Sequence, residues 1–257
     1  MRICIIGAGH MGAWLAEELC LDHEVAVYDI DRAKLKSCSN GRRFLDLHEV
    51  GSFKPELMIN AVSLHNTYKA FEDALPFLPE DCILCDIASV KTGFYAYYKG
   101  TGRRFVSTHP MFGPTFANIR DPRDENAIII KESDKEGKGF LRDFYQRRHV
   151  NTYEYSFEEH DKTMAYCLSI PFASSMVFAA CMKNQEAPGT TFRKHREIAR
   201  GLLSKDDHLV AEIMFNPYTV PQIEDIHSRL GYLAQIIRDR DYEKMRAFLE
   251  RLRNNVA

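Results

Sequence analysis

The feature that most constrains the fold of this chain is a glycine-rich turn near its N-terminus. Gly7-Ala8-Gly9-His10-Met11-Gly12 directly follows an apolar, β-branched run at residues 2–6 and precedes a stretch with helical spacing of apolar residues. A G-x-G-x-x-G sequence between a strand and a helix is the pattern of a dinucleotide-binding turn. Gly7 makes the tight bend, Gly9 lets the backbone approach a pyrophosphate, and Gly12 lets the helix pack on the strand. We therefore expect Gly7, Gly9, His10, Met11 and Gly12 to bind a cofactor, with free N–H groups of the helix facing its phosphates.

An acidic residue, Asp29, ends the next predicted strand (residues 23–28), 22 positions after Gly7. A carboxylate at this point accepts hydrogen bonds from the adenosine ribose and repels a 2′-phosphate. Asp29 therefore predicts NAD as the cofactor. Arg32 lies close enough to weaken that preference if its side chain turned inward, so NADP stays an alternative. A plain strand–helix turn in another kind of α/β protein is the remaining interpretation of the glycines.

Strand-like runs and helical stretches alternate over the first part of the chain. Further strands are predicted at residues 56–62, 82–85, 105–106 and 127–130, with helices at 68–78 and 135–148. This alternation predicts an α/β fold with a Rossmann-type, doubly wound parallel sheet over residues 1–155.

From Ser156 onward the sequence is helical in pattern. Ser156 is a candidate N-cap, and a long apolar helix follows it to about residue 183, with a kink near Pro171. Further helices are predicted at about 190–203, 206–215, 220–238 and 241–254. We therefore expect a second, all-helical domain over residues 156–257. A helix that is apolar nearly all round often packs against a second subunit, which predicts a homodimer.

Charge, hydropathy and cysteine usage narrow the class of protein. The net charge of −2 gives no reason to expect nucleic acid or an anionic membrane as a partner. No unbroken run of eighteen apolar residues occurs, and the N-terminus leads straight into a strand, so we expect a cytoplasmic protein without a membrane span. Cys82 and Cys85 form a C-x-x-C, but they lie in an apolar run and the chain has no second such pair. We expect buried, reduced thiols and no metal site.

Two polar segments that follow predicted strands are candidates for catalytic chemistry. Asp86-Ile-Ala-Ser-Val-Lys-Thr-Gly93 follows the strand at 82–85, and His109-Pro-Met-Phe-Gly-Pro114 follows the strand at 105–106. Parallel strands end on one edge of a sheet, where ligands bind, so Ser89, Lys91 and His109 are expected there. A neutral imidazole suits a general base. Each residue also has a structural alternative when it is taken singly. Ser89 would be a turn residue, Lys91 a solvated charge and His109 a strand cap.

Together with the glycine turn and His160-Asp161, these segments resemble the prephenate/arogenate dehydrogenase family of tyrosine biosynthesis, over nearly the whole chain. The resemblance implies a Rossmann domain followed by an all-helical domain similar to that of 6-phosphogluconate dehydrogenases, in a protein that is usually dimeric. It also implies oxidation of a ring alcohol by hydride transfer to NAD(P)⁺, with loss of the ring carboxylate and aromatisation. The expected activity is that of an NAD-dependent prephenate dehydrogenase.

The same resemblance implies roles for individual residues. His109 is the expected general base, which takes the proton of the C4 hydroxyl of the substrate. Ser89 is expected to orient that histidine or the hydroxyl. Lys91 is expected in the substrate site, where it fixes the loop near the nicotinamide, and Ser63 is expected to line the cofactor site.

The substrate of this family carries at least two negative charges, so a basic group is expected from the helical domain. Arg193, Arg196 and Arg200 share one face of the predicted helix at 190–203. A guanidinium suits bidentate binding of a carboxylate. The resemblance implies one substrate arginine in this helix: Arg200 is the first candidate, Arg196 the second, and a solvated basic face is the alternative.

The chain also departs from the family pattern. Thr115 stands where many members carry an acidic residue, and residues 168–172 lack the histidines that many members have there. His160 and Asp161 match the pattern, although capping or pairing at the helix start would explain them. Because neither Thr115 nor Asn118 offers a charge for the amino group of arogenate, prephenate is the expected substrate and arogenate the alternative. A non-catalytic NAD-binding sensor is the alternative of a different class.

Overall fold

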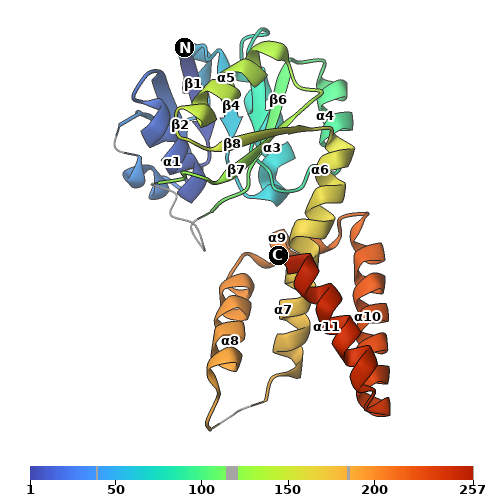
Figure 1. The fold of residues 1–257 in the computed structure, drawn as a ribbon. Helices are drawn as coiled ribbons and strands as arrows, with labels where there is room; N and C mark the ends of the chain where they lie inside the picture. The colour runs from blue at the N-terminus through green and yellow to red at the C-terminus, as the bar shows by residue number, and fades with distance from the viewer. Residues whose placement is uncertain (39, 114–120, 184–185, 257) are drawn as a thin grey trace.

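A computed structural model describes residues 1–38, 40–113, 121–183 and 186–256 of the chain. An eight-stranded sheet with helices on both faces forms the first part, and a group of helices extends away from it (Figure 1).

The sheet has the strand order β3-β2-β1-β4-β5-β6-β7-β8. Its strands are β1 (Arg2–Ile6), β2 (Glu24–Tyr28), β3 (Arg42–Phe44), β4 (Leu57–Asn60), β5 (Ile83–Asp86), β6 (Phe105–Pro110), β7 (Asn126–Ile130) and β8 (Asn151–Tyr155). The six strands from β3 to β6 in this order are mutually parallel, which confirms the doubly wound prediction for them. β7 instead runs antiparallel to β6, and β8 is parallel to β7.

Alternation along β1 explains how both faces of the sheet are covered. Ile3 and Ile5 belong to one buried cluster, and Cys4 and Ile6 to another, because successive side chains of a strand point to opposite faces. The first cluster is covered by α1 (His10–Leu19) and α5 (Lys135–Gln146), and the second by α2 (Glu49–Phe53), α3 (Thr67–Ala74) and α4 (Phe94–Thr101). A strand buried on both faces requires the continuous apolar runs seen in the sequence.

The helical part begins directly after β8. Ser156 caps α6 (Phe157–Met164) in a capping box, in which its hydroxyl accepts from the Glu159 N–H and the Glu159 carboxylate accepts from the Ser156 N–H. A π-helical turn, η4 (Ala165–Ser169), connects α6 to α7 (Ile170–Cys181), and Pro171 occupies the first turn of α7. The remaining helices are α8 (Thr190–Leu203), α9 (Asp207–Met214), α10 (Thr219–Asp239) and α11 (Tyr242–Val256).

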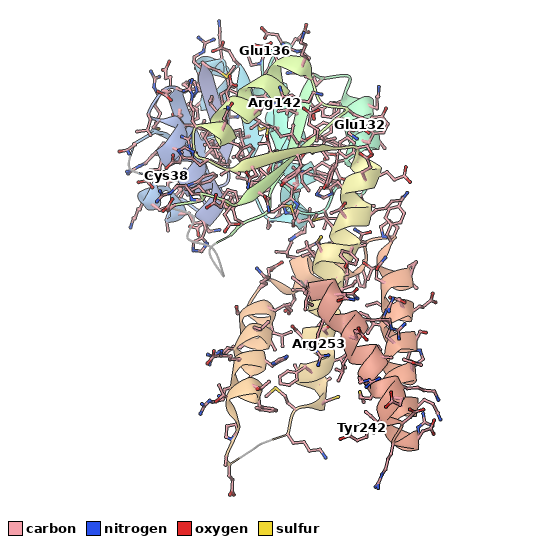
Figure 2. The ribbon with its side chains drawn as sticks, in the orientation of Figure 1. Cys38, Glu132, Glu136, Arg142, Tyr242 and Arg253 are labelled. Carbon is pink, nitrogen blue, oxygen red and sulfur yellow. The ribbon has the colours of Figure 1, made fainter. Side chains whose placement is uncertain are left out.

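The helices of this part spread apart and leave apolar side chains uncovered. Figure 2 shows Tyr242 and Arg253 toward opposite ends of α11, in the helical part, whereas the sheet domain is densely filled with side chains. The stretch Phe157–Cys181 is long and apolar enough to cross a membrane by length and composition, with a mean hydropathy of 1.6 and 22 % of that window buried. The central helix of a soluble protein has the same length and composition, and buried polar residues in α6 engage the sheet domain.

One buried cluster joins the two parts of the molecule. Val90, from the loop after β5, is buried with Phe172 of α7, Leu202 of α8 and Ile213 of α9. Leu64, from the turn after β4, packs against the same cluster. Two loops at the carboxyl edge of the sheet are therefore held directly by the helical part.

The cysteines are free thiols, but they are not all buried. Cys82 and Cys85 are buried, as predicted for the C-x-x-C, and so are Cys4 and Cys38, whereas Cys167 and Cys181 are exposed on the long helix. Burial raises the pKa of the Cys82 thiol to about 12, which leaves no reactive thiolate in the C-x-x-C.

Candidate active site

The glycine turn has the conformation that its sequence requires. Gly7 has φ of +103°, in the region that favours glycine, and a Cβ there would lie 2.7 Å from the backbone of Ala61. A Cβ on Gly12 would lie 1.8 Å from the carbonyl oxygen of Gly7, so only glycine lets α1 approach the turn so closely. A Cβ on Gly9 would meet nothing within 4 Å, so the space beside Gly9 is open to a ligand.

The start of α1 offers donors to that open space. Gly9 is the N-cap and provides no side-chain cap, and the Ala13 N–H donates to the Gly9 carbonyl. The N–H groups of His10, Met11 and Gly12 precede this first helical bond, and helix geometry leaves them without intrahelical partners. The Met11 side chain packs against the core, and the His10 side chain is exposed. The backbone of these residues therefore suits an anionic group.

A cleft of about 290 Å³ lies beside this turn, lined by Gly7, Gly9, Asp29 and Ser63 among others. The Asp29 carboxylate is fixed, because Oδ2 accepts from the Ala8 N–H at 2.7 Å and Oδ1 from the Asp31 N–H at 2.8 Å. The Arg32 guanidinium donates to the Leu45 carbonyl at 3.3 Å and does not line the cleft. The turn, the free donors and the fixed carboxylate fit a dinucleotide.

His109 lies at the carboxyl end of β6, where a buried hydrogen-bond chain begins. Its Nδ1 is 3.0 Å from Nε2 of His160, and Nδ1 of His160 is 3.0 Å from Oδ1 of Asp161. Nε2 of His109 has no hydrogen bond to any other residue that the structure describes. His109 comes from the sheet domain and the other two residues from α6, so the chain crosses between the two parts of the molecule.

Asp161 is held from several directions. Its Oδ2 accepts from the Thr92 hydroxyl at 2.8 Å, and its Oδ1 also accepts from the Lys91 N–H at 3.1 Å. The Asn216 side chain donates to the Asp161 carbonyl at 2.8 Å. The loop after β5 thus meets the start of α6 at the carboxylate of Asp161.

The structure places Lys91 differently from the prediction. Its ammonium group forms a fully buried ion pair with Asp86 and donates to the Thr108 carbonyl at 2.7 Å. Tyr98 donates to the other Asp86 oxygen at 2.7 Å. With 1 % of its surface exposed, Lys91 cannot reach a substrate in this conformation, and its ion pair anchors the ends of β5 and β6. We therefore correct its assignment as a substrate-binding residue.

Ser89 is partly buried in the same loop, between Ala88 and Val90. It forms no hydrogen bond with another described residue, so the partner that fixes the His109 ring is His160 and not Ser89. The second role expected of Ser89, orienting a substrate hydroxyl, stays a prediction.

Burial sets the protonation of the two histidines. Burial, followed by the nearby His160 and Lys91, holds the pKa of His109 well below its ordinary value of 6.5. Burial also lowers the pKa of His160, and the hydrogen bond to Asp161 opposes that shift. His109 is therefore neutral at neutral pH, as a general base must be.

The three arginines of α8 are exposed at different distances along the helix. Arg193 is near the N-terminal end, where it donates to Thr190 at 3.4 Å. Arg200 lies in the last turn, roughly 10 Å further along the axis at 1.5 Å per residue. Leu202, next to that turn, shares the buried cluster of Val90, so the Arg200 end of α8 reaches the sheet edge.

The sequence interpretation gave His160 and Asp161 too little weight. Their adjacency at a helix start is compatible with simple capping, whereas their partners lie 51 and about 70 positions away. The pairing of a histidine with an aspartate, in a segment predicted to adjoin the sheet edge, was the available signal. Thr115 and Asn118, on which the expected preference for prephenate depends, lie outside the described residues, as does Pro114.

The chain is similar in sequence to known dehydrogenases. Residues 16–128 match the family model described as prephenate dehydrogenase, nucleotide-binding domain. A probable arogenate/prephenate dehydrogenase of Methanocaldococcus jannaschii is 23 % identical over 267 residues, which cover 95 % of this chain and 58 % of that protein. The T-protein of Enterobacter agglomerans is 22 % identical over 206 residues, covering 76 % and 54 %. The chain therefore spans little more than half the length of these relatives.

Solved structures share the fold over the whole chain. Prephenate dehydrogenase from A. aeolicus, in complex with hydroxyphenyl propionate and NAD⁺, superposes with a TM-score of 0.87 at 19 % identity, covering 99 % of this chain and 96 % of that one. Synechocystis arogenate dehydrogenase gives 0.79 at 17 % identity, covering 99 % and 98 %. The fold and site define a protein with a Rossmann-type nucleotide-binding domain followed by a helical domain. Within that class, the chain is similar in sequence and in fold to prephenate and arogenate dehydrogenases.

Proposed function

We propose that the chain is an NAD-dependent prephenate dehydrogenase of tyrosine biosynthesis, which converts prephenate to 4-hydroxyphenylpyruvate and CO₂. One observation carries the proposal: a buried, neutral histidine, whose Nε2 has no hydrogen bond to another of the described residues, lies on the same sheet edge as a cleft that suits a dinucleotide. Prephenate and arogenate dehydrogenases that share the fold and match the sequence support the choice of substrate class.

The residues of the cleft would hold NAD. The N–H groups of His10, Met11 and Gly12 would bind the pyrophosphate, the Asp29 carboxylate would accept from the adenosine ribose, and Ser63 would line the cofactor pocket. When bound, NAD⁺ takes up the hydride that leaves C4 of the substrate. An acidic residue fixed by two backbone N–H groups disfavours a 2′-phosphate, which supports NAD over NADP.

His109 would act on the hydroxyl at C4. Its Nε2 accepts the hydroxyl proton as the C4 hydride leaves, and the Ser89 hydroxyl orients the same oxygen. Loss of the ring carboxylate as CO₂ then supplies the electron pair that makes the ring aromatic, and the resulting phenolate takes a proton back from His109. The reaction therefore releases no net proton, and His109 has to hold one only temporarily.

The test is to mix the purified protein with NAD⁺ or NADP⁺ and with prephenate or arogenate, and to follow the absorbance of the reduced cofactor. We expect NADH with prephenate, and His109→Asn should lower turnover roughly 10²- to 10⁴-fold with NAD binding intact. Reduced cofactor formed with arogenate would move the assignment to arogenate dehydrogenase. Binding of NAD without product from either substrate would indicate a non-catalytic sensor.

We also propose that the protein is a homodimer through its helical domain. Val177 of α7 is 55 % exposed, and Val220, Leu230 and Ile237 of α10 are 62, 53 and 59 % exposed, so both helices present apolar side chains that a second subunit would bury. Sedimentation equilibrium should show a dimer that Val177→Glu shifts toward monomer. Leu21→Glu, at an apolar residue of the sheet domain that is 74 % exposed, is the matched control and should leave the dimer intact. A wild-type monomer at all concentrations would contradict this proposal.

A further inference from the structure

The hydrogen-bond chain from His109 to Asp161 fixes the proton positions on two histidines. Both Asp161 oxygens accept, Oδ1 from the Lys91 N–H and Oδ2 from the Thr92 hydroxyl. A carboxylate between such donors accepts from the histidine as well, so Nδ1 of His160 carries a proton and donates it.

The same reasoning extends one residue further. A neutral imidazole has one donor and one acceptor nitrogen, so Nε2 of His160 accepts. It lies 3.0 Å from Nδ1 of His109, which therefore donates. Nε2 of His109 is then the nitrogen without a proton, at the position where a hydroxyl proton is to be taken. One carboxylate thus sets the tautomers of two rings in series.

We propose that His160 and Asp161 are positioning residues for the reaction, which hold His109 in the tautomer with a free Nε2 and share the proton that it takes up. The role in holding the tautomer of His109 rests on the geometry alone. The role in sharing its proton rests on the proposed function. When the O–H bond of the substrate breaks and an N–H bond forms at Nε2 of His109, the Nδ1 proton of His109 passes to Nε2 of His160. The new imidazolium then faces Asp161, and the steps reverse when the phenolate takes its proton.

The hydrogen-bond chain of His109, His160 and Asp161 is buried, which makes transfer of the proton toward Asp161 favourable. His109 is 6 % exposed and His160 is fully buried, so an isolated imidazolium at His109 would lack solvation. The nearby charges of Lys91 and Asp86 offset each other in their ion pair. The carboxylate of Asp161 is the charge that contacts the chain, and moving the proton one ring toward it brings opposite charges together.

The tautomer can be tested without turnover, by ¹⁵N NMR of protein labelled at histidine. We expect His109, identified by the signal lost in His109→Asn, to be protonated at Nδ1 and unprotonated at Nε2 at neutral pH. His160→Gln and Asp161→Asn should alter that signal, and His227→Gln, at an exposed histidine of α10, should not. A His109 protonated at Nε2 in the wild-type protein would overturn the inference, whether or not the protein turns over prephenate.

The proton transfer from His109 to His160, called the relay below, is tested by single-turnover kinetics in mixtures of H₂O and D₂O. His160→Gln keeps an acceptor for Nδ1 of His109 but cannot take the proton, so we expect NADH formation to slow roughly 10²-fold with KM and NAD affinity unchanged. The dependence of the rate on deuterium fraction should be curved for the wild type, because two protons move, and linear for His160→Gln. An unchanged rate, a loss confined to KM, or equal curvature in both proteins would each overturn the relay. His160→Phe tests the loss of the acceptor, and if it does not fold, His160→Gln still decides the question. Absence of NADH from the wild type would count against the proposed function and leave the NMR result to stand.

Discussion

Asp86 and Lys91 show how a motif residue can serve the site without touching the substrate. The pair is fully buried, and each partner has a further hydrogen bond, from Tyr98 to the carboxylate and from the ammonium to the Thr108 carbonyl. Burial lowers the pKa of Lys91, and the Asp86 carboxylate opposes that shift. The ion pair fixes the loop after β5, and the Lys91 N–H of that loop donates to Asp161. The pair therefore affects His109 only indirectly, through Asp161 and His160.

Lys91→Met would leave the Asp86 carboxylate buried without a cation. We expect the free energy of unfolding to fall by roughly 3–5 kcal/mol, the usual result of breaking a buried ion pair on one side. Lys69→Met removes an exposed i,i+4 pair with Asp73 and is the matched control, with no measurable change expected. Thermal and urea unfolding of the three proteins would show the difference, and equal midpoints would mean that the Asp86–Lys91 pair is not the anchor described.

At the scale of elements, α8 carries the candidate for carboxylate recognition. Its last turn adjoins the cluster that contains Val90, while its first turn lies at the far end of the helical part. If the substrate binds at His109 and Ser89 as proposed, Arg200 is expected to lie nearest to it along α8, Arg193 farthest, and Arg196 between them.

We expect Arg200→Ala to raise KM for the substrate about 10- to 100-fold, as the loss of a charge-assisted hydrogen bond of about 1.5–3 kcal/mol requires. Arg193→Ala removes the same charge from the same helix and should change KM little. Steady-state kinetics on both variants and on Arg196→Ala would assign the contact. A raised KM for Arg196→Ala with none for Arg200→Ala would transfer the role to Arg196.

The elements differ in how far the sequence could predict them. The strands buried on both faces read as continuous apolar runs, and the helices of residues 190–254 are marked by spacing and caps, so both were predicted close to their bounds. β3 and β8 were missed because they are edge strands with polar sequences, Arg42-Arg43-Phe44 and Asn151-Thr-Tyr-Glu-Tyr155. The glycine turn was predictable because its constraint is local. The contact of His160 with His109 was not, because a distance across 51 residues depends on the folded arrangement of both domains.

At the scale of the whole molecule, the buried histidines tie stability to pH. His109 and His160 both have a pKa below 6.5 in the folded protein, and both recover the ordinary value when the chain unfolds. Below pH 6.5 the unfolded state therefore binds more protons than the folded state. Their contribution to stability is complete above about pH 6.5 and is lost as the pH falls toward the folded values.

We expect the free energy of unfolding to decrease below pH 6.5 by at most about 1.4 kcal/mol per pH unit for each of the two histidines. The double variant His109→Asn, His160→Gln lacks both groups and should show a shallower decrease. His23, whose pKa burial also lowers, is present in both proteins and cancels from the comparison. Urea unfolding between pH 5 and 8 measures the two slopes, and parallel curves would contradict the account.

Val90 carries a practical consequence for recombining this chain with its relatives. It is buried among Phe172, Leu202 and Ile213 of the helical part, although it stands between Ser89 and Lys91 in the sequence of the sheet domain. A chimera spliced at Ser156 would pair a foreign helical half with this loop and would take His109 from one parent and His160 from the other. The halves are therefore not interchangeable modules. A working hybrid would have to carry the loop after β5 and the helices that enclose it as a single inherited unit.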